Sequence, residues 1–289
     1  MSKGKELWRA IKLFLLYTVI GEVITGLGAC SLLFRGLSKH MSREAIMESI
    51  YESNYYKLLE CTAYLLIIII FINNRYVKMS LGRMARMNRR TLWTAIVIAA
   101  MIGMGCIFSD VSFWELIGGE DRFFPEDAEK IGIKYEAMAK GVLGLLAGAI
   151  LAPISEEILC RGIILRSMLK MRWHPWVAIP MSALIFSVWH GTAFQTISIL
   201  PFGIIFGWLY WRTKSLLPCI IIHIVNNAIA FGSYYIPESS DDDTEVSMKV
   251  WIIIFAISIS LIAFGINWYR KKTRLQYNSI ALREGQELS

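Results

Sequence analysis

Charged residues are scarce in this chain of 289 residues: Asp, Glu, Lys and Arg make up 18% of it, whereas hydrophobic residues make up 55%. So few charges between long apolar runs argue against a soluble domain and indicate a multi-span membrane protein. The net charge of +7 comes largely from basic residues in short loops between those runs. The positive-inside rule explains this pattern, so we expect no nucleic-acid partner and a lipid bilayer instead.

Several motifs are also absent. The five cysteines contain no CxxC pair and lie in or beside apolar runs, which is typical of small buried hydrophobic residues rather than of disulfides or a zinc knuckle. There is no HExxH motif and no internal repeat. The missing HExxH argues against a zincin-type protease, and the missing repeat argues against a transporter built from inverted halves.

Long apolar runs predict an all-α, polytopic membrane protein with about eight transmembrane helices. The predicted spans are 13–34, 58–72, 93–108, 141–169, 175–194, 197–211, 215–236 and 250–268. We expect the fourth to continue past Pro153, which would kink it. The compact loops favour a prokaryotic source and therefore a bacterial cell membrane.

The loops alternate in charge. The loop 73–92 carries six Lys or Arg and no acid, whereas 109–136 carries eight Asp or Glu against three Lys or Arg, and a second acidic tract spans 238–245. The positive-inside rule then places both termini in the cytoplasm and the acidic loops outside. We divide the chain into N-terminal spans with an acidic external loop (1–136), a core (137–240), and a last span with a basic cytoplasmic tail (241–289).

Two adjacent carboxylates, Glu156 and Glu157, close the apolar run that begins at Gly141. A charge at membrane depth costs several kcal/mol and is rarely kept without a partner or a task. Glu157 and Arg161 are four residues apart and share a helix face, so they can form a structural pair. Glu156 lies about 100° round the helix, without that partner, and about 15 Å deeper than the basic residues after the span.

Two of the four histidines, His190 and His223, lie within predicted spans. Phe186 is one turn before His190, and Asn227 is one turn after His223, so each pair shares a helix face. Buried His and Asn often serve only as hydrogen bonds between helices. The convergence of these residues with Glu156 in one half of the chain favours a catalytic site.

The three motifs Glu-Glu-x-x-x-Arg, Phe-x-x-x-His and His-x-x-x-Asn, each in its own apolar segment, resemble those of the CAAX prenyl protease type 2 and bacteriocin-processing (CPBP, or Abi) family of intramembrane endopeptidases. The resemblance covers about 141–232, within the core 137–240. It implies that Glu156 and His190 activate a water and that His223 and Asn227 stabilise the oxyanion. Glu157, Arg161 and Phe186 would support them. The implied substrate is a peptide or membrane protein, of membrane-associated or prenylated, CAAX-like type, cut near the cytoplasmic face.

Other interpretations stay open. Glu156, His190 and His223 are plausible zinc ligands with a free fourth position, although we favour a mechanism with no cofactor. The same fold could serve as a non-catalytic membrane adaptor or bacteriocin self-immunity protein, and intramembrane acids also occur in transporters. The sequence does not identify the substrate or the oligomeric state.

Overall fold

The computed structural model describes residues 2–85, 88–235 and 246–286. Side chains are described for all of these except 76, 81, 82, 84, 85 and 273–286. Helices form almost all of the described chain, and no strand occurs in it. The predicted fold class, an all-α polytopic membrane protein, is therefore confirmed. The predicted acidic tract at 238–245 lies outside the described residues.

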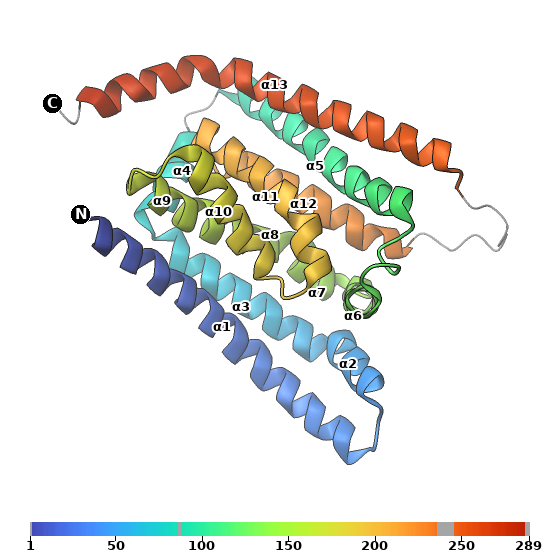
Figure 1. Ribbon diagram of the computed structural model, residues 1–289. Coiled ribbons are helices and arrows are strands. Elements are labelled where there is room, and N and C mark those ends of the chain that lie inside the picture. Colours follow the sequence, from blue (N-terminus) through green and yellow to red (C-terminus); the bar gives the residue numbers. More distant parts are fainter. Residues whose placement is uncertain (1, 86–87, 236–245, 287–289) are drawn as a thin grey trace.

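The helices pack into one bundle, in which α5 lies between α12 and α13 (Figure 1). They are α1 (Lys3–Ser38), α2 (Arg43–Glu52), α3 (Asn54–Ile72), α4 (Arg75–Ala85), α5 (Arg89–Ile117), α6 (Pro125–Ala139), α7 (Val142–Leu145), the π-helix η1 (Leu146–Leu151), α8 (Ala152–Glu157), the π-helix η2 (Ile158–Leu165), α9 (Arg166–Lys170), α10 (Pro175–Val188), α11 (Ala193–Thr213), α12 (Leu217–Gly232), the 3-10 helix η3 (Ser233–Tyr235) and α13 (Met248–Gln286).

Seven helical stretches of the described chain are long and apolar enough to span a membrane: 3–38, 54–72, 89–117, 142–170, 193–213, 217–235 and 248–272. The predicted fifth span, 175–194, is instead the short helix α10 of 14 residues. At 1.5 Å per residue it is about 21 Å long, against about 30 Å for the hydrocarbon core. It packs against α11, and His190 lies beyond its end rather than within a span.

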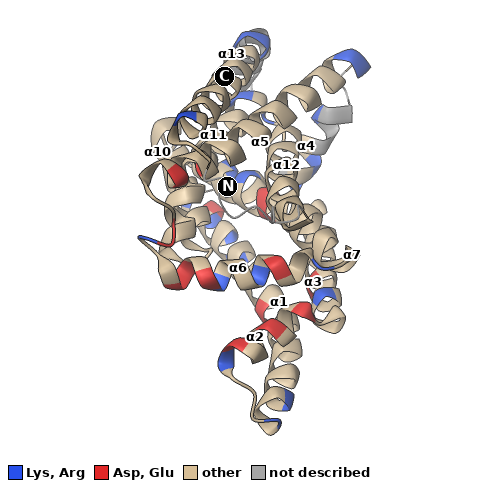
Figure 2. Ribbon diagram, turned by 90° about the vertical axis from the view of Figure 1, so that its right-hand side faces the viewer, with Lys and Arg blue, Asp and Glu red and all other residues tan. Residues whose placement is uncertain are grey.

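Two further boundaries differ from the sequence-based prediction. Asn88 caps the start of α5 by accepting a hydrogen bond from the Thr91 amide, and Gly118, with φ of 105°, ends it in the left-handed conformation that favours glycine. The third span therefore runs to Ile117, into the segment expected to be a loop. The remainder of that acidic segment forms α6, which crosses the end of the bundle opposite the two termini (Figures 1 and 2).

The fourth span is continuous from Val142 to Lys170, as predicted, but it changes pitch twice. The π-helix η1 ends at Leu151, two residues before Pro153, whose ring lacks an amide hydrogen, and η2 begins directly after Glu157. Single π-helical turns frequently occur at functional sites. The glutamate pair thus ends the short α-helical piece between two π-helices.

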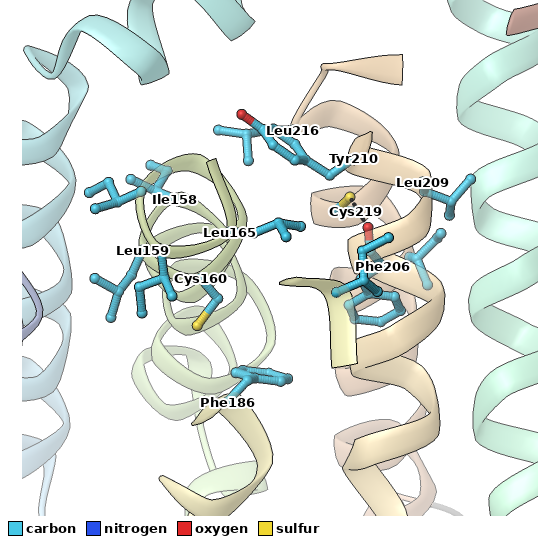
Figure 3. Packing of buried hydrophobic residues seen from close by; sticks show 14 of the residues in the cluster. Ile158, Leu159, Cys160, Leu165, Phe186, Phe206, Leu209, Tyr210, Leu216 and Cys219 are labelled. Atoms are coloured by element: carbon cyan, nitrogen blue, oxygen red, sulfur yellow. Dashed lines mark hydrogen bonds between the residues drawn. The ribbon is translucent and has the colours of Figure 1, made fainter. Parts of the chain in front are cut away.

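The main hydrophobic core surrounds η2, where all eight residues are buried. Figure 3 shows Leu165 of η2 pointing toward Phe206 and Tyr210 of α11, whereas Ile158 and Leu159 lie on the opposite side of η2. On the outer side of the bundle, α5 packs against both α12 and α13. This core fills the half of the bundle that follows the glutamate pair along the fourth span.

Candidate active site

The four residues predicted to be catalytic line one cavity of about 400 Å³. Glu156 comes from the end of α8, His190 from the turn after α10, and His223 and Asn227 from α12. The volume is within the range of small-molecule and peptide-sized sites, about 300–1,000 Å³. The fold therefore brings together all four residues from three separate segments of the chain.

The two adjacent glutamates face different surroundings. Glu156 lines the cavity. Glu157 is fully buried and its Oε1 accepts a hydrogen bond of 2.8 Å from Nη1 of Arg161, which is the pair expected from their spacing. The same oxygen lies 3.0 Å from Nδ1 of His223, a contact that the sequence did not predict. Helical geometry thus divides the pair into a cavity-lining carboxylate and a buried one.

Arg161 is 1% exposed and its guanidinium is enclosed by protein on several sides. Nη2 donates to the carbonyl of Gly203 at 3.1 Å, and the charge lies 4.5 Å from the ring centroid of Phe186 and 5.2 Å from that of Phe206. A guanidinium that stacks on aromatic rings and pairs with a carboxylate is well suited to burial. Arg161 therefore holds Glu157 beside His223.

The hydrogen bonds of the two histidines indicate which ring nitrogen carries a proton. Nδ1 of His190 lies 2.9 Å from the carbonyl oxygen of Phe186, and Nδ1 of His223 lies 3.0 Å from the Glu157 carboxylate. Because a carbonyl and a carboxylate only accept, Nδ1 of each ring must be the donor. In the neutral form of each histidine, Nε2 is then left with a lone pair and can accept a proton.

The rings of the site also contact each other directly. Phe186 meets His190 edge to face at 4.9 Å and His223 at 5.7 Å between centroids, and Phe206 lies 5.6 Å from His223. Nε2 of His223 lies 3.7 Å from Oε2 of Glu156, too far for a direct hydrogen bond. Both ring nitrogens of His223 thus face a carboxylate of the glutamate pair.

Asn227 contacts the first π-helix. Its Nδ2 donates to the carbonyl of Gly148 at 3.0 Å, which leaves its other amide hydrogen and its Oδ1 for further contacts. Neighbouring Asn226 also lines the cavity, and its buried Oδ1 has no hydrogen-bond partner among the described residues. The α12 end of the cavity therefore presents two amide side chains.

Several other polar residues of the site were missed or left without a task. Tyr17 of α1 shares a hydrogen bond of 2.9 Å with Ser155, directly before the glutamate pair, and packs on Trp189 beside His190. Glu60, which the sequence showed only as a stray acid, and Lys134 of α6 also line the cavity. Burial lowers the pKa of the Lys134 ammonium, but the Glu60 carboxylate and nearby groups outweigh it, so the pKa is raised overall. No local pattern could have joined residues so far apart in the chain.

The zinc alternative named Glu156, His190 and His223 as ligands. Within the described part of the chain, no three His, Cys, Asp or Glu side chains are grouped so that they could hold a metal ion. Nδ1 of His190 and Nδ1 of His223 are both engaged with protein acceptors, which leaves Nε2 of each ring as the nitrogen that faces the cavity chemistry. The mechanism proposed below routes no chemical step through a metal.

A carboxylate, two imidazoles and two amide side chains line one cavity within a helical bundle, which makes this cavity the candidate functional site. Residues 138–229 match the family model described as type II CAAX prenyl endopeptidase, Rce1-like. The resemblance inferred from the three motifs is thus confirmed for this segment, which lies within the predicted core 137–240. The match supports intramembrane protease activity in general terms. No curated protein and no solved structure matches the chain.

Proposed function

We propose that the protein is an intramembrane endopeptidase that hydrolyses peptide bonds of membrane-associated substrates with a water activated by Glu156 and His190. One observation carries the proposal: Glu156, His190, His223 and Asn227 all line the same cavity, within the segment that matches a protease family. Substrates of prenylated, CAAX-like type are one class within this proposal.

In the first step, a water held between Glu156 and Nε2 of His190 adds its oxygen to the peptide carbonyl carbon, and its proton passes to the Glu156 carboxylate. The carbonyl oxygen gains the negative charge. In the second step, the C–N bond breaks and the proton on Glu156 passes to the leaving amine.

The charge on the carbonyl oxygen requires donors that are fixed in advance, because preset dipoles stabilise such a charge most where water is excluded. Protonated His223 supplies an N–H at Nε2, and the buried Glu157 carboxylate at its Nδ1 stabilises that imidazolium. The second amide hydrogen of Asn227 supplies another donor. Arg161 compensates the charge of Glu157.

The test is cleavage of a diverse peptide library, read by mass spectrometry, with the detergent-purified parent and the folded Glu156→Gln variant. Cleavage by the parent alone is expected, and the cut sites would begin to define the substrate. Equal cleavage by both would reject Glu156 as the base. A parent that cuts neither the library nor membrane-anchored peptides would favour the adaptor or immunity role, in which Glu156 and His190 substitutions leave the phenotype unchanged.

A further inference from the structure

The cavity that contains Glu156 extends toward one end of the bundle only. Its lining residues in α3 lie between Tyr56 and Ile67, in the part of the helix that starts beside α2, and those in α11 lie between Gln195 and Phe206. In the fourth span they are Gly148, Ala152 and Glu156, which all precede the second π-helix. Every one of these stretches faces the end of the bundle that α6 crosses (Figure 1).

Toward the other end, the bundle is filled by the main core. The eight residues of η2, which follow the glutamate pair along the fourth span, are buried, and Leu165, Tyr210 and Leu216 belong to the same hydrophobic cluster (Figure 3). Among the described residues, none of 73–85, 88–90, 158–185 or 207–222 lines the cavity. The described lining of the cavity therefore leads to Glu156 from the α6 end.

The closed end carries the basic loops. Hydrogen bonds tie its elements together: the Leu216 amide donates to Ser80 Oγ at 2.8 Å, and Nη2 of Arg212 donates to the carbonyl of Arg270 at 2.9 Å. The chain segments at this end of the bundle carry the basic residues Lys3, Lys5, Arg9, Lys12, Arg75, Lys78, Arg83, Arg89, Arg90, Arg166, Lys170, Arg172, Arg212, Lys214, Arg270, Lys271 and Lys272. Such an excess of Lys and Arg marks the cytoplasmic end of a membrane protein.

The helix α6 crosses the end of the bundle toward which the cavity extends, and hydrogen bonds hold α6 near its start and near its end. Near its start, Asp127 Oδ2 accepts the Ala193 amide hydrogen at 3.0 Å. Near its end, Nζ of Lys57 donates to the carbonyl oxygens of Ala137 and Lys140 at 2.7 and 2.6 Å. Figure 2 shows that α6 and α2 carry most of the acidic residues at this end.

The part of the cavity beneath α6 is polar. Glu60, Lys134 and Gln195 line it from three different helices, and Glu22, which is exposed, lines it from α1. Charged and hydroxyl groups at membrane depth occur where water reaches them or where they line a pathway. This lining suits the backbone of an extended peptide that enters together with water.

From this arrangement we infer that the active-site cavity opens on the extracytoplasmic side of the membrane, so that the substrate is a peptide segment exposed on that side. The inference rests on the proposed function for its substrate, but not for the direction of the opening. It reverses the expectation that cleavage occurs near the cytoplasmic face, because residue spacing predicts the depth of Glu156 but not the side from which the cavity is reached.

The direction is tested by labelling single cysteines in intact cells with a membrane-impermeant maleimide. In a Cys30→Ser background, because Cys30 is the exposed native cysteine, the reporters are Lys130→Cys on α6, Lys271→Cys at the basic end and Glu22→Cys in the cavity. All three native side chains are exposed, so the variants are expected to fold. We expect Lys130→Cys and Glu22→Cys to be labelled in intact cells, and Lys271→Cys only after permeabilisation.

Labelling of Lys271→Cys but not Lys130→Cys in intact cells would overturn the inference, as would a Glu22→Cys thiol that is labelled only from the cytoplasmic side or from neither side.

A membrane-impermeant peptide that the purified parent cleaves then separates this inference from the proposed function. Right-side-out vesicles should cleave it and inside-out vesicles should not, and the reverse result would reject the inference alone. A parent that cleaves no peptide, with the predicted labelling pattern, would reject the proposed function alone.

Discussion

Nδ1 of His223 lies 3.0 Å from Oε1 of Glu157, so the buried member of the glutamate pair holds the imidazole that faces the other member. A single residue of α12 therefore faces both glutamates: its Nδ1 is within hydrogen-bond distance of Glu157, and its Nε2 lies 3.7 Å from Oε2 of Glu156. In the proposed mechanism, Glu157 acts through His223 and Glu156 acts on water.

The first prediction concerns this contact. A hydrogen bond to a charged group contributes about 1.5–3 kcal/mol, against about 0.5–1.5 kcal/mol for a neutral one, so Glu157→Gln should lower kcat about 10-fold. The measurement is steady-state cleavage of a peptide from the library, beside the matched variant Glu115→Gln, whose carboxylate is exposed at the end of α5. Equal kcat values for the two variants would remove Glu157 from the mechanism.

The second prediction concerns Arg161. Removal of one partner of a buried ion pair typically destabilises a protein by about 3–5 kcal/mol, because the other charge is left buried without compensation. Arg161→Leu should therefore lower the thermal midpoint in detergent sharply. The double variant Arg161→Leu/Glu157→Gln should recover part of the loss, since no charge is left alone. A midpoint for Arg161→Leu equal to that of the parent would contradict the burial of this pair.

The third prediction tests how closely α6 packs on the fourth span. A Cβ at Gly144 would collide with the backbone carbonyl of Met138, which cannot move away as a side chain could, whereas a Cβ at Gly132 of α6 meets nothing within 4 Å. We expect Gly144→Ala to reduce both stability and cleavage. Gly132→Ala should be neutral or should stabilise α6 by about 0.5–1 kcal/mol. If the two variants have the same thermal midpoint, α6 does not pack on Gly144.

The fourth prediction concerns metal dependence. Because the cavity holds no group of three His, Cys, Asp or Glu side chains suited to a metal among the described residues, treatment with a zinc chelator should leave cleavage unchanged. Elemental analysis of the purified protein should find less than one zinc per chain. Loss of activity with chelator and its recovery with added zinc would return Glu156, His190 and His223 to the role of ligands.

The sequence predicts which residues line the site better than it predicts the contacts between helices that hold those residues in place. Residues one helical turn apart, such as Glu157 and Arg161, were paired correctly because helix geometry fixes their faces. The His223–Glu157 contact joins residues of two different helices, and no spacing within one segment encodes it. Likewise, apolar composition does not show where α10 ends, so His190 was expected in a span although it lies in the turn that follows.

The role of α6 could not be read from the sequence for a related reason. Its acidic composition marks an exposed segment, but its position depends on single hydrogen bonds with distant residues. Asp127 of α6 accepts the Ala193 amide hydrogen at the start of α11, and Lys57 of α3 donates to the Ala137 carbonyl at the end of α6. The π-helices around Glu156 and Glu157 arise from tertiary packing and leave no periodic signal. These features decide how the cavity is closed and reached.

The most direct test of the central claim is kcat for one library peptide in two variants, Glu156→Gln and Glu115→Gln. Glu156 lines the cavity near His223, whereas Glu115 is exposed at the end of α5. If Glu156 is the general base, Glu156→Gln should lower kcat by about 100- to 10,000-fold, whereas Glu115→Gln should stay within about twofold of the parent. Equal kcat values for Glu156→Gln and the parent would contradict the account.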